Sequence, residues 1–98
     1  MQARFTLSED AVADLREIGR FTLRQWGAEQ RNRYLAQLDR QFARIAVNPN
    51  LGRARPEIGE GIRSAPEGSH LIIFQVKGTG VEILNVVHQS MDIKPRDD

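Results

Sequence analysis

The sequence predicts an α+β domain in which a helical hairpin packs on one face of a mostly antiparallel sheet, in the order β-α-α-β-β-β. The apolar runs Leu71–Val76 and Val81–Val87 flank the turn Lys77–Gly80, as in a β-hairpin. Earlier in the chain, apolar residues recur at helical spacing from Glu9 to Asn48, with one interruption at Gly27. A chain of 98 residues is expected to form one domain, covering residues 1–98.

The amino-terminal segment predicts a strand followed by a helix. Apolar and polar residues alternate over Gln2–Leu7, which is typical of a short strand. Ser8 follows as an N-cap, and two acidic residues come next, where they complement the helix dipole. We therefore expect a helix from about Glu9 to Trp26, ended by Gly27 because glycine tolerates the left-handed conformation.

A second helix is expected to begin at Ala28, where helix-forming residues resume. Leu38, Phe42 and Ile45 form its apolar stripe. Asn48–Pro49 ends it, because proline disfavours helical geometry in the residue before it. Since the link between the two helices is so short, they are expected to pack as an antiparallel hairpin.

Residues 49–61 form the one irregular stretch, rich in glycine and charged residues. Leu51 and Ile58 are the side chains expected to anchor it to the body of the domain. A short strand is expected around Ile62–Ala65, followed by a turn at Pro66–Gly68 that leads into the hairpin.

The two long strands are apolar on both faces. The alternation assigns Ile72, Phe74, Val76, Val81, Ile83 and Val87 to one face, and Leu71, Ile73, Leu84 and Val86 to the other. Because the helices cover one face only, the other is expected to be covered by a partner chain or by the polar tail from Met91, which is otherwise expected to fray. Exposed apolar surface on a small domain is typical of an interaction site.

The composition excludes or disfavours several classes of protein. Cysteine is absent, so disulfides and thiol chemistry are excluded. No stretch approaches the roughly 20 apolar residues of a membrane span, and the amino end has no long apolar leader, so we expect a cytoplasmic protein without a membrane partner. A net charge of +1 does not mark a nucleic-acid binder. Arginine supplies twelve of the fourteen basic residues, which suits protein interfaces and phosphate alike but can also reflect genome base composition.

No residue is assigned a catalytic role, and no metal or cofactor is expected. His70 and His88 lack a third ligand at suitable spacing, and each is interpreted as a half-buried hydrogen-bonding residue. Arg53, Arg55 and Arg63 form the densest basic cluster. They are expected either to pair with nearby carboxylates and helix C-terminal carbonyls or to contact an acidic partner.

Several short segments, taken in order, form a further pattern. They are Leu7-Ser8, Ala11, Asp14-Leu15, Trp26-Gly27, Tyr34-Leu35, Asn48–Arg53, Arg55–Glu57, Gly61–Ser64, Val81–Leu84 and Val86–His88. Together they extend from about Phe5 to Asp92 and resemble the ParE branch of the RelE/ParE toxin superfamily of bacterial type II toxin–antitoxin pairs.

The resemblance implies a toxin that inhibits DNA gyrase by binding it, without catalysis. It also implies a ParD-like antitoxin, in a complex expected to be 2:2 or higher, with DNA bound only indirectly through the antitoxin. The expected antitoxin contacts are Leu71, Ile73, Leu84 and Val86, with Arg53, Arg55 and Arg63 as charged contacts. The expected gyrase contacts are Arg63, His88 and Met91.

Two alternatives remain open. One is a RelE-type, ribosome-dependent mRNA endoribonuclease, which requires basic groups on the sheet and an aromatic hydroxyl, or a His-Tyr or His-Phe pair, near the end of the last strand. Arg63 and His88 fit that requirement, whereas the single tyrosine, Tyr34, is placed on the second helix. The other alternative is an antitoxin-binding module without toxicity. Trp26 is expected in the core, or else as an interface anchor.

Overall fold

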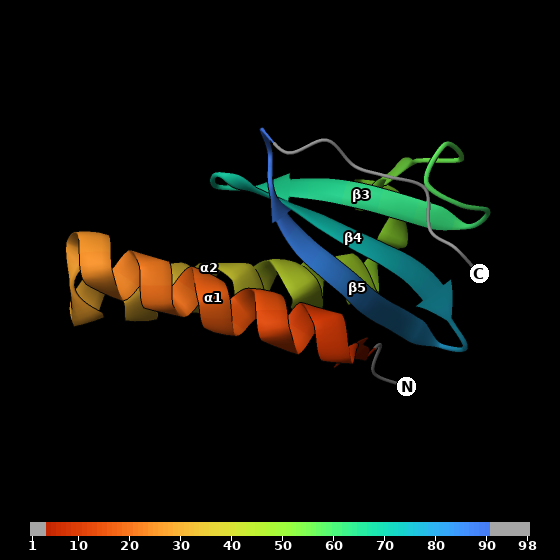
Figure 1. The fold of residues 1–98 in the computed structure, drawn as a ribbon. Coiled ribbons are helices and arrows are strands. Elements are labelled where there is room, and N and C mark those ends of the chain that lie inside the picture. The colour runs from red at the N-terminus through yellow and green to blue at the C-terminus, as the bar shows by residue number, and fades with distance from the viewer. Residues whose placement is uncertain (1–3, 91–98) are drawn as a thin grey trace.

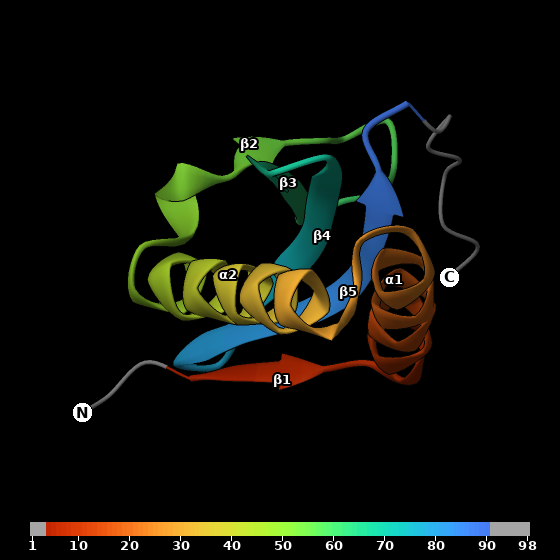
Figure 2. The ribbon, with the colours of Figure 1, turned by 90° about the vertical axis from the view of Figure 1, so that its left-hand side faces the viewer.

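A computed structural model describes residues 4–90 and shows two layers, a helical hairpin on one face of a five-stranded sheet (Figures 1 and 2). The strands are β1 (Phe5–Leu7), β2 (Arg53–Ala54), β3 (Ile62–Glu67), β4 (His70–Lys77) and β5 (Gly80–His88), and their spatial order is β1-β5-β4-β3-β2. β1 runs parallel to β5, and the other pairings are antiparallel. The predicted α+β class is confirmed.

Both helices have the bounds that the sequence predicts, α1 at Glu9–Trp26 and α2 at Ala28–Val47. The Ser8 hydroxyl oxygen accepts a hydrogen bond from the Ala11 backbone N–H at 3.0 Å, as an N-cap does. Gly27 joins the helices with a φ of 93°. The end of the hairpin that holds this connection extends beyond the sheet (Figure 1).

The main core lies between the helices and the sheet. Its largest fully buried side chains are Leu38, Phe42 and Ile45 from α2, Ile72 and Phe74 from β4, and Ile83 from β5. We call this core the helix-side cluster, and its other buried members are Ala11, Ile18, Ala46, Ala65, Val81 and Val86. The alternation predicted for β4 is confirmed, because Ile72 and Phe74 belong to this cluster and Ile73 lies on the opposite face.

A β-bulge in β5 changes which of its residues face the helices. The pairing with β4 shifts by one position and leaves Leu84 as the extra residue. Because an extra residue reverses the alternation beyond it, Ile83 and Val86 both lie in the helix-side cluster. The expectation that Val86 faces outward with Leu84 is therefore wrong. So is the matching expectation for Val87, which stands opposite the outward residue Leu71.

The outward face of the sheet carries a second, smaller core. It consists of Ile58, Ile62, Ile73 and Leu84, with Leu71 packed against them. Ile58 comes from the loop between β2 and β3, so the expectation that no element except the tail can cover this face is wrong. Ile73 is 2% exposed and Leu84 is 5% exposed. The predicted tail from Met91 lies outside the described residues.

Two short elements were not foreseen by the sequence pattern, a 3-10 turn at Pro49–Leu51 and the two-residue β2. Ile58 anchors the loop as predicted, but Leu51 is 49% exposed and does not. Among residues 4–90 there is no helix whose length and apolar character would let it span a bilayer.

Candidate functional site

Arg63 does not share a face with the outward apolar residues. It stands opposite Phe74, a member of the helix-side cluster. Its guanidinium donates two hydrogen bonds to the carbonyl of Gly52, from Nε at 3.1 Å and from Nη2 at 2.6 Å. Arg63 therefore fastens β3 to the segment that follows α2. This matches the carbonyl-binding role that the sequence left open for the arginine cluster.

Arg55 is also engaged within the chain. It donates to the Glu57 carboxylate at 2.6 Å and to the Ser64 hydroxyl at 3.0 Å. The hydrogen bond from Arg55 holds the pKa of Glu57 below its usual value. The carboxylate-pairing alternative is thus confirmed for Arg55, while Arg53 lies exposed on the edge strand β2.

The exposed apolar surface lies elsewhere than the sequence predicts. Of the four expected apolar contacts, Leu71 alone keeps appreciable exposure, because Ile73, Leu84 and Val86 are buried. Large exposed apolar side chains include two aromatic residues of α1, Phe21 at 56% and Trp26 at 71% exposure, besides Val47, Leu51 and Val76. Of the two alternatives for Trp26, the core position is therefore wrong.

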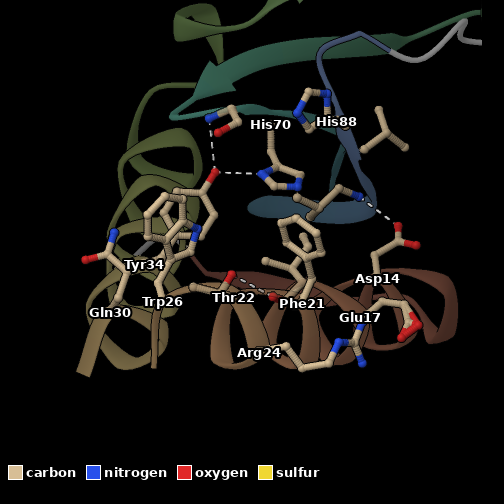
Figure 3. A pocket seen from close by; sticks show the side chains of 14 residues that line it. Asp14, Glu17, Phe21, Thr22, Arg24, Trp26, Gln30, Tyr34, His70 and His88 are labelled. Atoms are coloured by element: carbon tan, nitrogen blue, oxygen red, sulfur yellow. Dashed lines mark hydrogen bonds between the residues drawn. The ribbon is translucent and has the colours of Figure 1, made fainter. Parts of the chain in front are cut away.

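Both aromatic residues line a cavity of ≈ 690 Å³ between α1, the start of α2 and the ends of β4 and β5 (Figure 3). We call it the histidine pocket. Its lining comprises Asp14, Glu17, Ile18, Phe21, Thr22, Arg24, Trp26, Gln30, Tyr34, Ser69, His70, Val86, Val87 and His88. Apolar walls with a few convergent polar groups are typical of binding sites.

Tyr34, His70 and His88 form a row across the top of this pocket (Figure 3). The Tyr34 hydroxyl lies 2.6 Å from His70 Nδ1 and accepts a hydrogen bond from the Ser69 backbone N–H at 3.1 Å. The rings of His70 and His88 stand edge to face, with centroids 5.5 Å apart. Gly68, with a φ of +57°, lets Tyr34 approach, since an added Cβ would lie 2.6 Å from the tyrosine ring.

Burial explains the protonation states in this row. It lowers the pKa of His70, and the neighbouring His88 lowers it further, while Asp14 acts in the opposite sense. Burial also raises the pKa of Tyr34. At neutral pH, His70 is therefore mainly neutral and Tyr34 keeps its proton, so a hydrogen bond joins two uncharged side chains.

One carboxylate in the pocket has a structural role. The Asp14 side chain of α1 accepts a hydrogen bond from the Val86 backbone N–H at 2.8 Å, just beyond the bulge of β5. This hydrogen bond links α1 to β5 next to the β-bulge. Within residues 4–90, no cluster of three or more His, Cys, Asp or Glu side chains could hold a metal ion.

The sequence does not predict this grouping. It placed Tyr34 on a helix, remote from the histidines, and no local pattern links residue 34 to residue 70. A partial signal existed for the histidines, because a hairpin centred on Lys77–Gly80 brings the start of β4 and the end of β5 together. The helical periodicity of α1 did not indicate that Phe21 and Trp26 would be exposed.

Comparison with known proteins identifies the family. Residues 5–93 match the family described as the ParE toxin of the type II toxin–antitoxin system parDE. Toxin ParE1 of Mycobacterium tuberculosis is 40% identical over 94 residues, which cover 95% of this chain and 96% of that protein. Both shares exceed nine tenths, so the likeness extends over the whole domain rather than over one motif.

Solved structures show the same fold. The chromosomal ParDE system of Pseudomonas aeruginosa has a TM-score of 0.75 at 22% identity, covering 89% of this chain and 96% of that chain. The RelBE2 toxin–antitoxin complex of Mycobacterium tuberculosis has a TM-score of 0.64 at 23% identity, covering 91% of this chain and 100% of that chain. With the match of residues 5–93, the chain belongs to the ParE toxin family of type II toxin–antitoxin systems.

Proposed function

We propose that this chain inhibits DNA gyrase by binding it, without catalysing a reaction, and that a ParD-like antitoxin neutralises it. The observation that carries the proposal is the family match over residues 5–93, supported by a relative named as a ParE toxin at 40% identity. The site supports binding as well, because exposed aromatic side chains beside a pocket are the usual anchors of protein interfaces.

For gyrase, we propose the histidine pocket as the contact surface. His88 is exposed at its rim, and Phe21 and Trp26 stand on the opposite wall. Arg63, the other expected gyrase contact in the described segment, is already bound to Gly52. Met91 lies outside the described residues.

A supercoiling assay tests the gyrase proposal. Purified chain should inhibit supercoiling, and the double variant Phe21→Ala/Trp26→Ala should need at least about tenfold more protein for the same inhibition. Val47, the last residue of α2, is 76% exposed, and Leu51, in the 3-10 turn after it, is 49% exposed, so Val47→Ala/Leu51→Ala is a control away from the pocket. Undisturbed supercoiling with wild-type protein would contradict the proposal.

For the antitoxin, the sheet side offers Leu71, Arg53 and Arg55 as proposed contacts, since these keep some exposure. Because Ile73 and Leu84 are buried, they would pack behind the contact residues rather than touch the antitoxin. Co-expression with a ParD-like protein should restore growth and yield a heteromeric complex of 2:2 or higher stoichiometry, measured by light scattering. Harmless expression of the chain alone would favour the non-toxic binding module.

The endoribonuclease alternative gains one observation, the Tyr34 hydroxyl at 2.6 Å from His70 Nδ1. An aromatic hydroxyl and an imidazole could serve in acid–base chemistry. Asp14 and Glu17 line the same pocket, however, and their carboxylates repel a phosphate backbone. Incubation with translating ribosomes separates the two functions: cleaved message together with undisturbed supercoiling would favour the nuclease.

A further inference from the structure

The histidine pocket combines aromatic side chains with carboxylates. In Figure 3, Trp26 and Tyr34 stand at one end of the pocket, and Asp14 and Glu17 stand at the other. The ring of Phe21 lies between them. Phe21 and Trp26 are both substantially exposed, so their faces are open to an occupant. A partner protein on this surface would present a side chain to the pocket, and the lining decides the chemistry of that side chain.

The permanent charges of the pocket are mainly negative. Among the described residues that line it, Asp14 and Glu17 carry carboxylates, and Arg24 alone carries a permanent positive charge. The Asp14 carboxylate accepts hydrogen bonds from the Val86 N–H at 2.8 Å and from Asn85 Nδ2 at 3.4 Å, both on Oδ2. Neither donor is charged, so these contacts do not neutralise the carboxylate.

Both carboxylates are within reach of an occupant. Burial lowers the pKa of His70 and His88 lowers it further, whereas Asp14 raises it, so the charge of Asp14 acts on the interior of the pocket. Glu17 pairs with Arg20 at 3.1 Å, but each side chain is more than 60% exposed. Such an exposed ion pair contributes little to stability, so Glu17 can bind another cation at small cost.

This combination of groups suits a guanidinium. A guanidinium is planar and weakly hydrated, so it stacks on aromatic faces, and its fork of N–H donors matches a carboxylate. An ammonium group is a compact and strongly hydrated charge, which gains less from stacking. An apolar side chain would take water away from Asp14 and Glu17 without replacing its hydrogen bonds.

We propose that the histidine pocket binds an arginine side chain, stacked against Phe21 and Trp26 and paired with Asp14 and Glu17. The assignment of this arginine to gyrase rests on the proposed function. The bound arginine covers aromatic surface that is otherwise exposed to water and offsets the charge of the two carboxylates. Arg24 opposes the binding, because it brings a like charge to the same pocket.

The fluorescence of Trp26 reports occupancy of the pocket directly, since Trp26 is the single tryptophan of the chain. Three short capped peptides, with arginine, lysine or citrulline between alanines, are titrated to millimolar concentration. Citrulline has nearly the shape of arginine without its charge. The arginine peptide should bind at least about fivefold more tightly than either of the others. A citrulline or lysine peptide that binds as tightly, or no binding of the arginine peptide, would overturn the proposal.

Variants without the carboxylate charges locate the binding. Asp14→Asn/Glu17→Gln removes both charges, while asparagine keeps an oxygen that can accept the hydrogen bond from the Val86 N–H. Glu29→Gln/Asp39→Asn makes the same charge change on exposed residues of α2 that do not line the pocket. The first variant should lose the preference for arginine over citrulline, and the second should keep it. An unchanged preference in the first variant would overturn the proposal, and circular dichroism checks that both variants fold.

Arg24→Gln gives an independent test with the opposite sign. It removes the like charge and leaves both carboxylates in place, so the arginine peptide should bind at least about twofold more tightly than it binds the parent chain. Arg40→Gln is the control, because Arg40 is exposed on α2 and does not line the pocket. Equal binding of the peptide to the two variants would also count against the proposal.

The supercoiling assay tests the assignment to gyrase. Asp14→Asn/Glu17→Gln should need at least about tenfold more protein than Glu29→Gln/Asp39→Asn for the same inhibition. Equal inhibition by the two variants would show that gyrase does not supply the arginine, even if the peptides bind. Absence of inhibition by the parent chain would contradict the proposed function, whereas the peptide titrations would still decide whether the pocket binds arginine.

Discussion

The two flanks of α1 differ in what their polar groups do. On the flank of the histidine pocket, Asp14 binds the backbone of β5 at 2.8 Å, and Tyr34 and His70 meet across the pocket. The opposite flank borders a groove between α1 and α2 that Arg16, Arg20 and Arg31 help to line. There Arg16 is exposed, and the side-chain hydrogen bonds of Arg20 and Arg31 reach residues no more than three positions away. One flank therefore holds the fold together, while the other leaves its charges available.

This difference between the two flanks separates polar residues that stabilise the fold from polar residues that are available to bind a partner. A polar group that satisfies the backbone of another element is costly to remove, because its partner is left unpaired away from water. An exposed arginine bound only to a near neighbour costs little to replace. Stability measurements should therefore distinguish the two flanks.

Apart from the buried core, the largest effect should come from Gly68→Ala. The residue has a φ of +57°, and the new Cβ would meet the Tyr34 ring at 2.6 Å, so we expect a loss of about 2–4 kcal/mol in the free energy of unfolding. Gly78→Ala is the matched control, since Gly78 has a φ of +60° with nothing within 4 Å of an added Cβ. It should lose about 1–2 kcal/mol in urea unfolding. Equal losses would mean that the Tyr34 contact contributes nothing.

Asp14→Ala should follow. The Val86 N–H loses its acceptor, which should lower the free energy of unfolding by about 1–3 kcal/mol in urea titrations. Arg16→Ala, two residues away and on the other flank of the same helix, should stay within about 0.5 kcal/mol of the parent. Similar losses of unfolding free energy for both variants would show that the two flanks do not differ in their contribution to stability.

The histidine pocket should also make stability depend on pH. Burial lowers the pKa of His70 below its ordinary value of 6.5, so the unfolded chain binds the proton first as pH falls. The stability contributed by neutral His70 is fully present above pH 6.5 and is lost as pH falls through the folded-state pKa. The urea midpoint should therefore drop more between pH 7.5 and 5.5 for the parent than for His70→Asn. Parallel pH profiles would refute this role.

The smallest effect should come from Leu23→Ala, in the groove between α1 and α2. Leu23 is 41% exposed, and we expect a loss of no more than about 1 kcal/mol in unfolding free energy. Leu38→Ala, a buried residue of α2, should lose about 2–5 kcal/mol and serves as the reference. If Leu23→Ala costs as much as Leu38→Ala, the groove leucine already has a structural role.

The sequence predicts the helices well and the sheet faces less well. Ser8 and Gly27 are local signals, and they set both ends of α1. The bulge at Leu84 has no local signal, because β5 is apolar on both faces and either register satisfies the pattern. That single extra residue moved Val86 from a predicted contact surface into the core.

The candidate site was the least predictable part. The row of Tyr34, His70 and His88 joins three elements far apart in the chain, so only their packing brings the side chains together. Trp26 was ambiguous for another reason. It falls on the apolar periodicity of α1, but that end of the hairpin extends beyond the sheet, which therefore cannot cover it (Figure 1).

The parallel pairing of β1 with β5 joins residues 5–7 to residues 81–83, nearly the full length of the sheet-forming chain. Closing so long a loop lowers the entropy of the chain before the strand contact can stabilise it. Formation of this pairing is therefore expected to be slow. During synthesis the hairpin of α1 and α2 can form early, but the edge strand must wait for the last strand to be translated. A prematurely terminated chain would lack this closure, so truncated products should be substrates for proteases rather than folded toxins.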